Sequence, residues 1–584
     1  MNIVGINAFH ADASAAIFVN GKLIAAIEEE RFTRVKHWSG FPAQSIQFCV
    51  EEAGLSIEEI DFFVIGRDPY AKFLKKILYV AKNPLVNIPA IKDRLFNAKK
   101  TTSIDEELAL LFNKSITTFN NKIINIEHHK CHLASAFFAS DFEKALCVSI
   151  DGSGDFSTTM IAIGNKNDLE IIESVDFPHS IGLFYTAFTQ LLGFPNYGDE
   201  YKVMGMAPYG SPLYVNDLKK VLRCKQNGLF ELDLQFFRKG TAGLVSYSEN
   251  NIPTIQPLYS KKLEKIFGTA RKAGEPITSF HNDLAASVQK ITEETILHIL
   301  NFYQKKTGLT NLCLAGGVAQ NSVVNGKISS HTNFKQVYIP SAGSDAGISF
   351  GAALYLQHQI KKMPRQKAIL SAYTGSKFSN EQIISILNEK GIGFIQLSFN
   401  EIYDHVTNCL IDGGVVGWMN GRSEFGPRAL GARSILADPR RTDAKEILNA
   451  KIKRRESFRP FAPSILKEYV SEYFELEEPV PFMEKVFVIK AEKRSLIPAV
   501  THIDGTGRLQ SVDATVSTHY HQLIKTFYNK TGIPILLNTS FNENEPIVNN
   551  PHHAIDCFIR TNMDMLVMEN ILVTRKNLSL SKIS

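Results

Sequence analysis

The feature that most constrains the fold of this chain is a pattern of strands and turns that occurs twice. In residues 3–27, three apolar runs are separated by a polar turn that contains Asp12 and by the dipeptide Asn20-Gly21, a strong hairpin signal. Residues 146–175 repeat this order, with an acidic turn at 152–155. Such a repeat predicts two similar α/β subdomains that face each other, although two unrelated β-meanders would produce the same pattern.

This layout is that of the actin-like ATPases, in which the two acidic turns hold the phosphates and metal of a nucleotide. A later strand-like run, 311–315, leads into Gly316 and Gly317 and then into a helix start near Asn321. Glycines let a nucleotide approach the backbone, and a helix N-terminus favours anions. The pair is not a GxGxxG motif, so it does not establish a nucleotide site by itself. The loop around Lys202 combines Gly, Pro and Tyr, which indicates an ordered functional loop.

Two histidines, His128 and His132, lie between the two copies of the pattern. If the segment is helical, their spacing places both imidazoles on one helix face, which provides half of a metal site. Asp151 ends the next strand and could be a third ligand; Asp345 lies in a strand-to-helix turn and could be a fourth. Two alternatives remain open: the histidines can be surface or capping residues, and Asp345 can be a helix N-cap.

The C-terminal part of the chain is rich in ordered basic residues. A basic segment at 358–370, which is broken by Pro364, predicts a domain boundary. Beyond it, nine Lys or Arg and four acidic residues lie between Arg433 and Arg459, among Gly, Pro and Phe. Arginines held in this way suit bidentate binding of small phosphates. A solvated basic face and a nucleic-acid surface are the alternatives.

Length and composition set further limits. The 584 residues are too many for one core, so two or more domains are expected. A net charge of +5 does not by itself indicate nucleic-acid binding. The seven scattered cysteines form no CxxC pair, which favours a reducing compartment; Cys131 is either a further ligand or a small buried apolar residue. Without a signal-peptide pattern or a long apolar span, a cytoplasmic protein is expected.

The chain resembles the O-carbamoyltransferases of the nodulation-factor, cephem and tobramycin type. The resemblance rests on motifs that occur in the same order over nearly the whole chain. They are 9–14 (FHADAS), 28–32 (EEERF), the stretch with His128 and His132, 150–152 (IDG), 202–205 (KVMG), 316–319 (GGVA), 426–431 (GPRALG), 458–463 (FRPFAP) and 538–542 (NTSFN).

The resemblance implies an α/β fold with an actin-like (duplicated ribonuclease-H-like) domain at 1–360 and a YrdC-like domain at 371–584. The first is similar to the tRNA threonylcarbamoyl transferases and the second to the threonylcarbamoyl-adenylate synthases. Iron or another divalent metal would be held by His128, His132, Asp151 and Asp345. The implied catalytic residues are His10, Asp12 and His37 near the acceptor, and Lys453 and Arg459 in the second domain. Substrate and nucleotide binding is expected at Lys202, Gly316, Gly317, Asn321, Arg428, Lys453, Arg459, Arg508, Ser540 and Asn542.

The implied function is ATP-dependent O-carbamoylation. The second domain would make carbamoyl-adenylate from carbamoyl phosphate and ATP with Mg, and the first would transfer the carbamoyl group to a hydroxyl of a small metabolite in natural-product biosynthesis. His10 or Asp12 is the candidate base. The expected partners include neither nucleic acid nor a membrane, and a homodimer is compatible with the sequence. The alternatives are a tRNA threonylcarbamoyl-transferase-like enzyme and a non-catalytic actin-like nucleotide-binding protein, which would not explain the ordered arginines.

Overall fold

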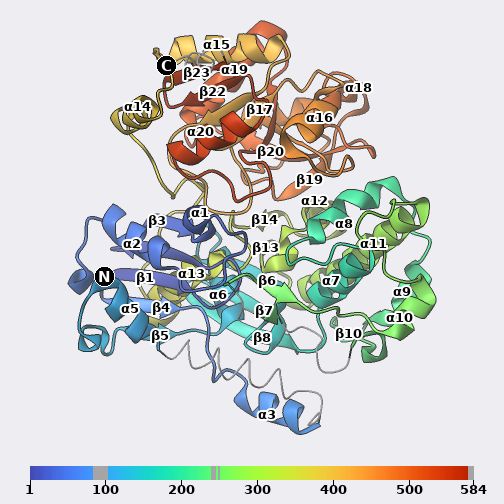
Figure 1. The fold of residues 1–584 in the computed structure, drawn as a ribbon. Helices are drawn as coiled ribbons and strands as arrows, with labels where there is room; N and C mark the ends of the chain where they lie inside the picture. Colours follow the sequence, from blue (N-terminus) through green and yellow to red (C-terminus); the bar gives the residue numbers. More distant parts are fainter. Residues whose placement is uncertain (83–102, 239–244, 247–249, 576–584) are drawn as a thin grey trace. The chain divides into compact units, whose positions relative to one another are not determined.

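The computed structural model describes residues 1–82, 103–238, 245–246 and 250–575. The chain divides into two compact units, residues 1–369 and 370–584 (Figure 1). The first unit contains the two copies of the strand pattern, and the second contains the arginine-rich stretches.

The first copy forms a five-stranded sheet in the order β3-β2-β1-β4-β5. β1 pairs antiparallel with β2 and parallel with β4, while β2–β3 is antiparallel and β4–β5 parallel. Asn20 and Gly21 both have positive φ, as the predicted hairpin turn between β2 and β3 requires. The strands are β1 (Asn2–Asn7), β2 (Ser14–Val19), β3 (Lys22–Glu28), β4 (Phe62–Ile65) and β5 (Ile123–Asn125).

The second copy forms a sheet with the same order and directions, β8-β7-β6-β13-β14. β6 is antiparallel to β7 and parallel to β13, β7 is antiparallel to β8, and β13 is parallel to β14. The strands are β6 (Lys144–Gly154), β7 (Ser157–Asn165), β8 (Asp168–Asp176), β13 (Asn311–Ala315) and β14 (Gln336–Tyr338). Two sheets with this shared topology confirm the duplicated ribonuclease-H-like architecture and exclude unrelated meanders.

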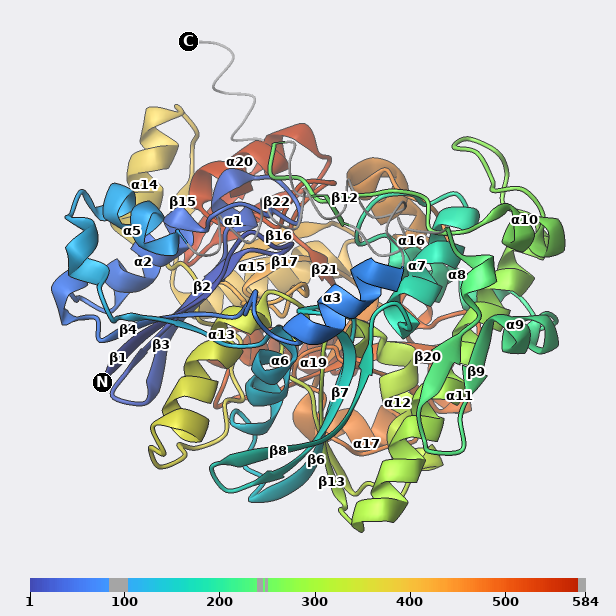
Figure 2. The ribbon, with the colours of Figure 1, turned by 90° about the horizontal axis from the view of Figure 1, so that it is seen from below.

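Two short helices lie between the sheets, α6 (His128–Phe137) and α13 (Gly347–Leu354). α6 packs on β6, β7 and β13, whereas α13 packs on β1, β2 and β4, and the two helices also pack on each other (Figures 1 and 2). Glycines permit this close packing: a Cβ at Gly351 would lie 1.9 Å from the carbonyl oxygen of Cys131, and one at Gly5 would lie 1.8 Å from that of Ser349.

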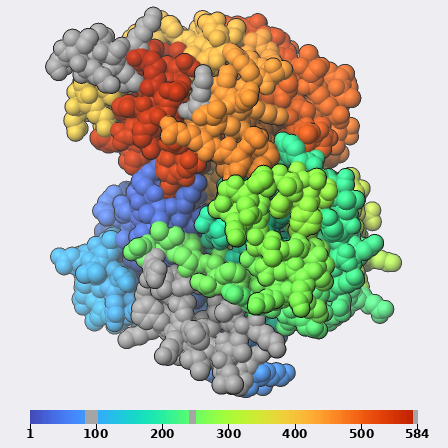
Figure 3. Space-filling model, turned by 45° about the vertical axis from the view of Figure 1, so that its right-hand side comes forward, coloured from blue at the N-terminus to red at the C-terminus, as the bar shows by residue number. Residues whose placement is uncertain are grey.

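The remaining elements of the first unit surround this centre. Helices of the second copy, including α10 and α11, form a broad part of the visible surface (green in Figure 3). The 29-residue α11 begins with a capping box at Thr278 and ends at Gly308 in a left-handed conformation. The elements are α1 (Glu30–Thr33), α2 (Ala43–Glu52), α3 (Phe73–Lys82), α5 (Ile104–Phe112), α7 (Ile181–Leu191), α8 (Glu200–Met206), α9 (Val215–Val221), β9 (Leu222–Cys224), β10 (Phe230–Leu232), β11 (Val245–Ser246), β12 (Thr254–Ile255), α10 (Lys261–Phe267), α11 (Ser279–Thr307) and α12 (Ser322–His331).

The second unit is built on a mixed nine-stranded sheet in the order β15-β23-β22-β16-β17-β21-β18-β20-β19. Pairs β16–β22 and β18–β20 are parallel and the others are antiparallel. Its strands are β15 (Ile395–Gln396), β16 (Val416–Met419), β17 (Arg433–Ala437), β18 (Ala462–Leu466), β19 (Lys485–Val488), β20 (Thr506–Val512), β21 (Ile535–Ser540), β22 (Met565–Met568) and β23 (Ile571–Thr574).

Helices cover this sheet and bury its core. α15 and α19 pack on each other and on the central strands, and α20 packs on β16 and β22. The fully buried Trp418 of β16 belongs to this core. The helices are α14 (Asn380–Glu389), α15 (Phe399–Ile411), α16 (Ala444–Ile447), α17 (Val470–Tyr473), α18 (Ala491–Arg494), α19 (Thr518–Thr531) and α20 (Pro551–Arg560). The fold class is the expected α/β class, with a first unit that has the duplicated, actin-like strand order and a second unit built on a mixed sheet covered by helices.

Candidate metal centre and anion site

The two spaced histidines lie on one face of α6, as the helical interpretation requires. Their rings are 4.7 Å apart, and the Nε2 atoms of His128 and His132 are separated by 3.1 Å. Both side chains are buried. Asp155 accepts the backbone N–H of His128 at 2.9 Å, so the turn after β6 fixes the start of the helix.

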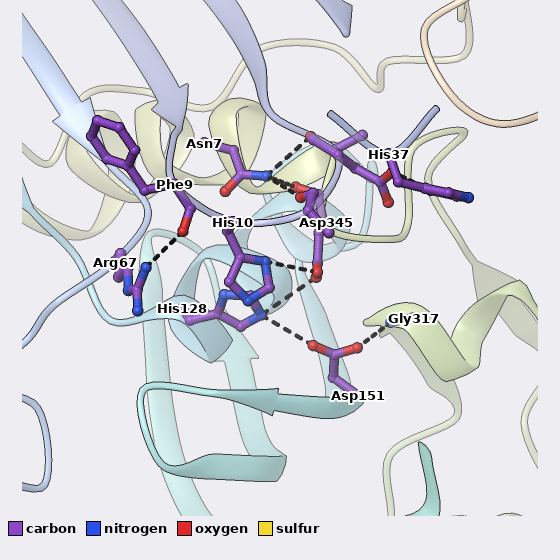
Figure 4. A network of polar contacts seen from close by, with 12 residues as sticks. Asn7, Phe9, His10, His37, Arg67, His128, Asp151, Gly317 and Asp345 are labelled. Atoms are coloured by element: carbon purple, nitrogen blue, oxygen red, sulfur yellow. Dashed lines mark hydrogen bonds and ion pairs between the residues drawn. The ribbon is translucent and has the colours of Figure 1, made fainter. Parts of the chain in front are cut away.

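Two carboxylates converge on these imidazoles, and Figure 4 shows Asp151 and Asp345 directed at His128. Asp151 Oδ2 lies 3.1 Å from His128 Nε2 and 3.7 Å from His132 Nε2. Asp345 Oδ1 lies 3.5 Å and 3.4 Å from the same two nitrogens. Asp345 precedes α13, but its carboxylate faces the histidines and the N-cap of that helix is Ala346. The N-cap alternative for Asp345 is therefore wrong.

The spacing of these atoms fits a bound cation. Metal–ligand bonds of about 2.1 Å place neighbouring donors about 3.0 Å apart in an octahedral site and about 3.4 Å apart in a tetrahedral one. The five separations given above range from 3.1 to 3.7 Å. Asp345 Oδ1 is buried and has no hydrogen-bond partner among the described residues. His128, His132, Asp151 and Asp345 could therefore hold a divalent metal.

The electrostatics of the cluster favour positive charge. Burial alone would lower the pKa of His132, but the neighbouring carboxylates of Asp151 and Asp345 raise it to about 9. Burial would raise the pKa of both carboxyls. For Asp151, the hydrogen bonds and charges of His128 and His132 hold the pKa well below its usual range. For Asp345, His10 and His132 lower it. Two buried carboxylates that remain ionised are suited to a cation between them.

Backbone groups around the cluster orient the ligands. The N–H of Gly317 donates to Asp151 Oδ1 at 2.9 Å, which leaves Oδ2 to face the histidines. The side-chain amide of Asn7 donates to the carbonyl oxygens of Ala11, Asp12 and Asp345, each at 3.0 Å. Asn7 therefore ties the first acidic turn to the Asp345 turn. It was missed because a single polar residue at the end of an apolar strand gives no motif.

The glycine pair expected at a nucleotide lies directly beside this cluster. Gly316 has φ of +95°, and a Cβ there would lie 2.2 Å from the carbonyl oxygen of Ile150. A Cβ at Gly317 would lie 2.7 Å from Asp151 Oδ1. The amide of Asn321 exchanges two hydrogen bonds with Gln289 and caps α12. Gly317 therefore has a definite local role, the hydrogen bond to Asp151.

The remaining candidates in the histidine stretch point elsewhere. His129 Nδ1 lies 2.7 Å from the hydroxyl of Ser149. Cys131 Sγ faces the carbonyl oxygen of Ile126 at 3.8 Å, and burial raises the pKa of its thiol well above the ordinary value. His129 and Cys131 are therefore packing residues beside the cluster.

The three residues expected near the acceptor are divided between two contacts. His10 Nδ1 lies 3.0 Å from Asp345 Oδ2, whereas the other oxygen of that carboxylate, Oδ1, lies nearest to His128 and His132. Asp12 and His37 form a separate pair, with Oδ1 and Nδ1 2.7 Å apart. Burial lowers the pKa of His37, but the neighbouring carboxylates of Asp12 and Glu30 raise it to about 9.

Lys202 lies in α8 and forms an ion pair with Asp199 at 2.8 Å. Its ammonium group also lies 5.1 Å from the ring centroid of Phe194. The loop before α8 approaches His37, because a Cβ at Gly198 would lie 2.5 Å from His37 Nε2. The predicted functional loop thus contacts His37 through its backbone.

In the second unit, the buried Lys453 is surrounded by oxygen atoms. Its Nζ donates to the backbone and side-chain oxygens of Asn542, each at 2.7 Å, and to those of Ser540. Lys453, Ser540 and Asn542 were all expected at the substrate site, and the structure brings them together. The β21 motif therefore positions the lysine.

A group of guanidinium ions lies near Arg508 of β20. Burial and the like charges of Arg428, Arg455 and Arg459 lower the pKa of Arg508 well below its ordinary value. Such clustering of like charges is unfavourable without an anion, so the group suits a phosphate. Arg455 was not among the predicted residues; its guanidinium lies 4.6 Å from the ring centroid of Phe461, within the FRPFAP motif.

Two protein-family models together match nearly the whole chain. A model described as Carbamoyltransferase N-terminus matches residues 2–354, and one described as Carbamoyltransferase C-terminus matches residues 407–575. Among the described residues, no helix has both the length and the apolar character needed to cross a bilayer.

Similar proteins occur in several bacteria. An uncharacterized protein of Synechocystis sp. is 40% identical over 608 residues, covering 98% of this chain and 97% of that protein. Nodulation protein NolNO of Sinorhizobium fredii is 35% identical over 585 residues, which cover 98% of this chain and 80% of that protein. The solved structure of T. kodakarensis HypF aligns with 62% of this chain and 48% of its own, at 13% identity and a TM-score of 0.31. The fold assignment therefore relies on the strand order.

Proposed function

This chain belongs to the carbamoyltransferase family, and on that basis we propose that it is an ATP-dependent O-carbamoyltransferase that acts on a hydroxylated small metabolite. The observation that carries the proposal is the presence of two chemically different clusters in two separate units. One combines imidazoles with carboxylates, and the other combines guanidinium groups with the buried ammonium of Lys453. A reaction in two stages would use each cluster once.

The first stage would take place in the second unit. Water hydrolyses carbamoyl phosphate to carbamate and free phosphate. A carbamate oxygen then attacks the α-phosphorus of ATP, the bond from that phosphorus to the bridging oxygen of the β-phosphate breaks, and carbamoyl-adenylate and pyrophosphate result. Negative charge spreads over the phosphate oxygens, so fixed cations lower the barrier. Arg428, Arg459 and Arg508 are proposed to bind the anionic groups, with Arg455 beside them. Lys453, held by Ser540 and Asn542, would supply a further positive charge.

The second stage would take place in the first unit, where the carbamoyl group passes to the acceptor hydroxyl and AMP leaves. A divalent metal held by His128, His132, Asp151 and Asp345 would supply Lewis-acid binding of an oxygen of the adenylate. Gly317 orients Asp151 through its N–H. Gly316 and Gly317 would let the nucleotide approach the backbone, with Lys202 and Asn321 on neighbouring elements.

His10 is the proposed base for the acceptor hydroxyl. Asp345 Oδ2 orients its ring through Nδ1, which directs Nε2 to the proton-accepting role. A pKa of about 9 keeps His37 protonated at neutral pH, so it is a hydrogen-bond donor to the acceptor and not a base. Asp12 fixes His37 in that orientation.

Two variants test the division of labour. We expect His132→Ala to lose bound metal and to lower carbamoyl transfer by at least about 100-fold, while carbamoyl-phosphate-dependent ATP–pyrophosphate exchange continues. Arg459→Ala should lower the exchange by about 100-fold or more and retain the metal. His331→Ala, at an exposed site, and Arg441→Ala, at a half-buried site paired with Asp443, are the matched controls. Equal loss of exchange in His132→Ala would show that the two stages are not divided between the clusters. Acceptors are screened by the mass increment of a carbamoyl group.

A further inference from the structure

The segment that connects the two units is anchored to the end of the helix that carries the histidines. Arg365 donates from Nη2 to the carbonyl oxygen of Phe137 at 2.7 Å, and also hydrogen-bonds to the carbonyls of Ser140 and Phe142. The N–H of Ile369 donates to the carbonyl of Ala139 at 2.8 Å. Residues 365–369 are thus held on the turn that follows α6.

The aromatic end of α6 takes part in the same contact. The guanidinium of Arg365 lies 4.5 Å from the ring centroid of Phe137. That ring also lies against β7, where a Cβ at Gly164 would come within 2.6 Å of it. Phe137 is fully buried. The last residue of α6 is therefore fixed by both the connecting segment and the sheet.

The C-terminus of a helix suits this arrangement. The last carbonyl groups of a helix have no partner within it, and its dipole favours a cation there. A planar guanidinium can serve several carbonyls at once, whereas an ammonium group is a compact point charge. Arg365 therefore adds a charged donor to the Phe137 carbonyl, which also accepts from Ser140, and ties it to the carbonyls of Ser140 and Phe142 just beyond α6.

The same helix is short, so its two ends move together. α6 has ten residues, about 15 Å, and both metal-site histidines lie in its first five residues. Sideways movement is blocked by the contact of Gly351 with Cys131. Sliding or tilting along the helix axis is opposed at the far end by Arg365. A displacement there of a few tenths of an ångström would change the distances from the histidines to Asp151 and Asp345.

We propose that Arg365 is a positioning residue for carbamoyl transfer: by anchoring the end of α6 it keeps His128 and His132 at ligand distance from Asp151 and Asp345. This inference rests on the proposed metal role of these four residues. It also makes the connection between the units part of the support of the metal centre. Arg365 itself touches none of the four.

The test is a titration of the metal-free, full-length protein with Co²⁺, followed by the d–d absorption of the bound ion. Arg365→Ala should weaken Co²⁺ binding by about 10–100-fold and alter the spectrum. Losses of this size are typical when a residue that orients metal ligands, without binding the metal itself, is removed. The Co²⁺ affinity of Arg365→Lys should lie between that of Arg365→Ala and that of the wild type. Lys362→Ala, three residues earlier, is the control, because the ion pair that its side chain makes among the described residues is an exposed one, with Asp168. Millimolar guanidinium ion should partly restore binding in Arg365→Ala alone.

Wild-type affinity and spectrum in Arg365→Ala would overturn the proposal. Should that variant fail to fold, Arg365→Lys decides: wild-type Co²⁺ binding by it counts against the proposal. Failure of the proposed function has a different signature, in which the wild-type protein shows neither Co²⁺ binding nor ATP-dependent carbamoyl transfer. ATP–pyrophosphate exchange should be unchanged in every Arg365 variant.

Discussion

Gly152 and Gly154 both lie in the last residues of β6, after Asp151, but have very different surroundings. An ideal Cβ at Gly154 would lie 2.1 Å from Cδ2 of His128, whereas no atom of the described residues outside its own chain neighbours lies within 4 Å of one at Gly152. The end of β6 therefore presses against the imidazole of His128 at Gly154 and is open at Gly152. Position 154 requires glycine because any side chain there would occupy the space of the His128 ring.

We expect Gly154→Ala to displace the His128 ring, to weaken metal binding by about 10–100-fold and to destabilise the first unit by about 1–3 kcal/mol. Gly152→Ala should change stability by less than about 0.5 kcal/mol and leave metal binding unchanged. Isothermal titration with Co²⁺ and urea unfolding measure both effects. Equal behaviour of the two variants would contradict the steric explanation.

The pair formed by His37 and Asp12 should make stability depend on pH. The pKa of His37 in the folded protein, about 9, is above its ordinary value of 6.5, so the folded state binds the proton more tightly. The resulting stabilisation is complete below pH 6.5 and is lost as the pH rises through about 9. His37→Gln should therefore lower the free energy of unfolding at pH 6 but not at pH 10.

Urea unfolding at the two pH values measures this difference. Asp12→Asn should lower the free energy of unfolding at pH 6 by the same amount as His37→Gln. The double variant should be destabilised no more than either single variant, because the two side chains act as one pair. Additive losses would show that the pair is not the source of the pH dependence.

At the scale of elements, the site depends on the close packing of α6 with α13. One helix carries both histidines, and Asp345 directly precedes the other. Gly351 lets the helices touch, because any side chain there would meet the carbonyl of Cys131. The separation of these helices therefore sets the distance between the histidines and Asp345.

Gly351→Ala should force α6 and α13 apart, lower the free energy of unfolding by about 1–3 kcal/mol or more, and reduce the stabilisation that metal provides. Unfolding curves with and without added metal separate the two effects. A variant that is destabilised equally with and without metal would show that the separation of the helices does not control the ligand geometry.

At the scale of the whole molecule, each compact unit has its own core and its own proposed ligands. The chain has two tryptophans, Trp38 in the first unit and Trp418 in the second. Trp418→Phe therefore leaves a reporter in the first unit, and Trp38→Phe leaves one in the second. Fluorescence can thus follow the unfolding of each unit in the full-length chain.

We expect a chelator to lower the melting temperature reported by Trp38 and to leave that reported by Trp418 unchanged. Binding of metal at 100 times its dissociation constant stabilises the folded state by about 2.7 kcal/mol, and only the first unit contains the histidine cluster. Pyrophosphate should raise the melting temperature reported by Trp418 and leave that reported by Trp38 unchanged. A chelator that shifts both transitions equally would contradict separate sites.

The sequence by itself determined the local elements of this protein. Apolar runs, the Asn20-Gly21 turn and the spacing of His128 and His132 predict strands, a hairpin and a helix, because such patterns depend on neighbouring residues. The repeat of the strand pattern predicted the duplicated fold, which the two sheets of identical order confirm. The family resemblance, carried by ordered motifs, suggested His128, His132, Asp151 and Asp345 as a set.

Only the tertiary structure decided which distant groups meet and what each of them does. Asp345 faces the histidines because two sheets clamp α6 against α13, which no local pattern encodes. The tertiary structure likewise brings the N–H of Gly317 to Asp151, the side chain of Asn7 to two turns, and Arg365 to the end of α6. No local pattern encodes these contacts either. These contacts join segments far apart in the sequence, and they depend on sub-ångström packing. The ordinary residue types involved carry no signal of that packing until the chain is folded.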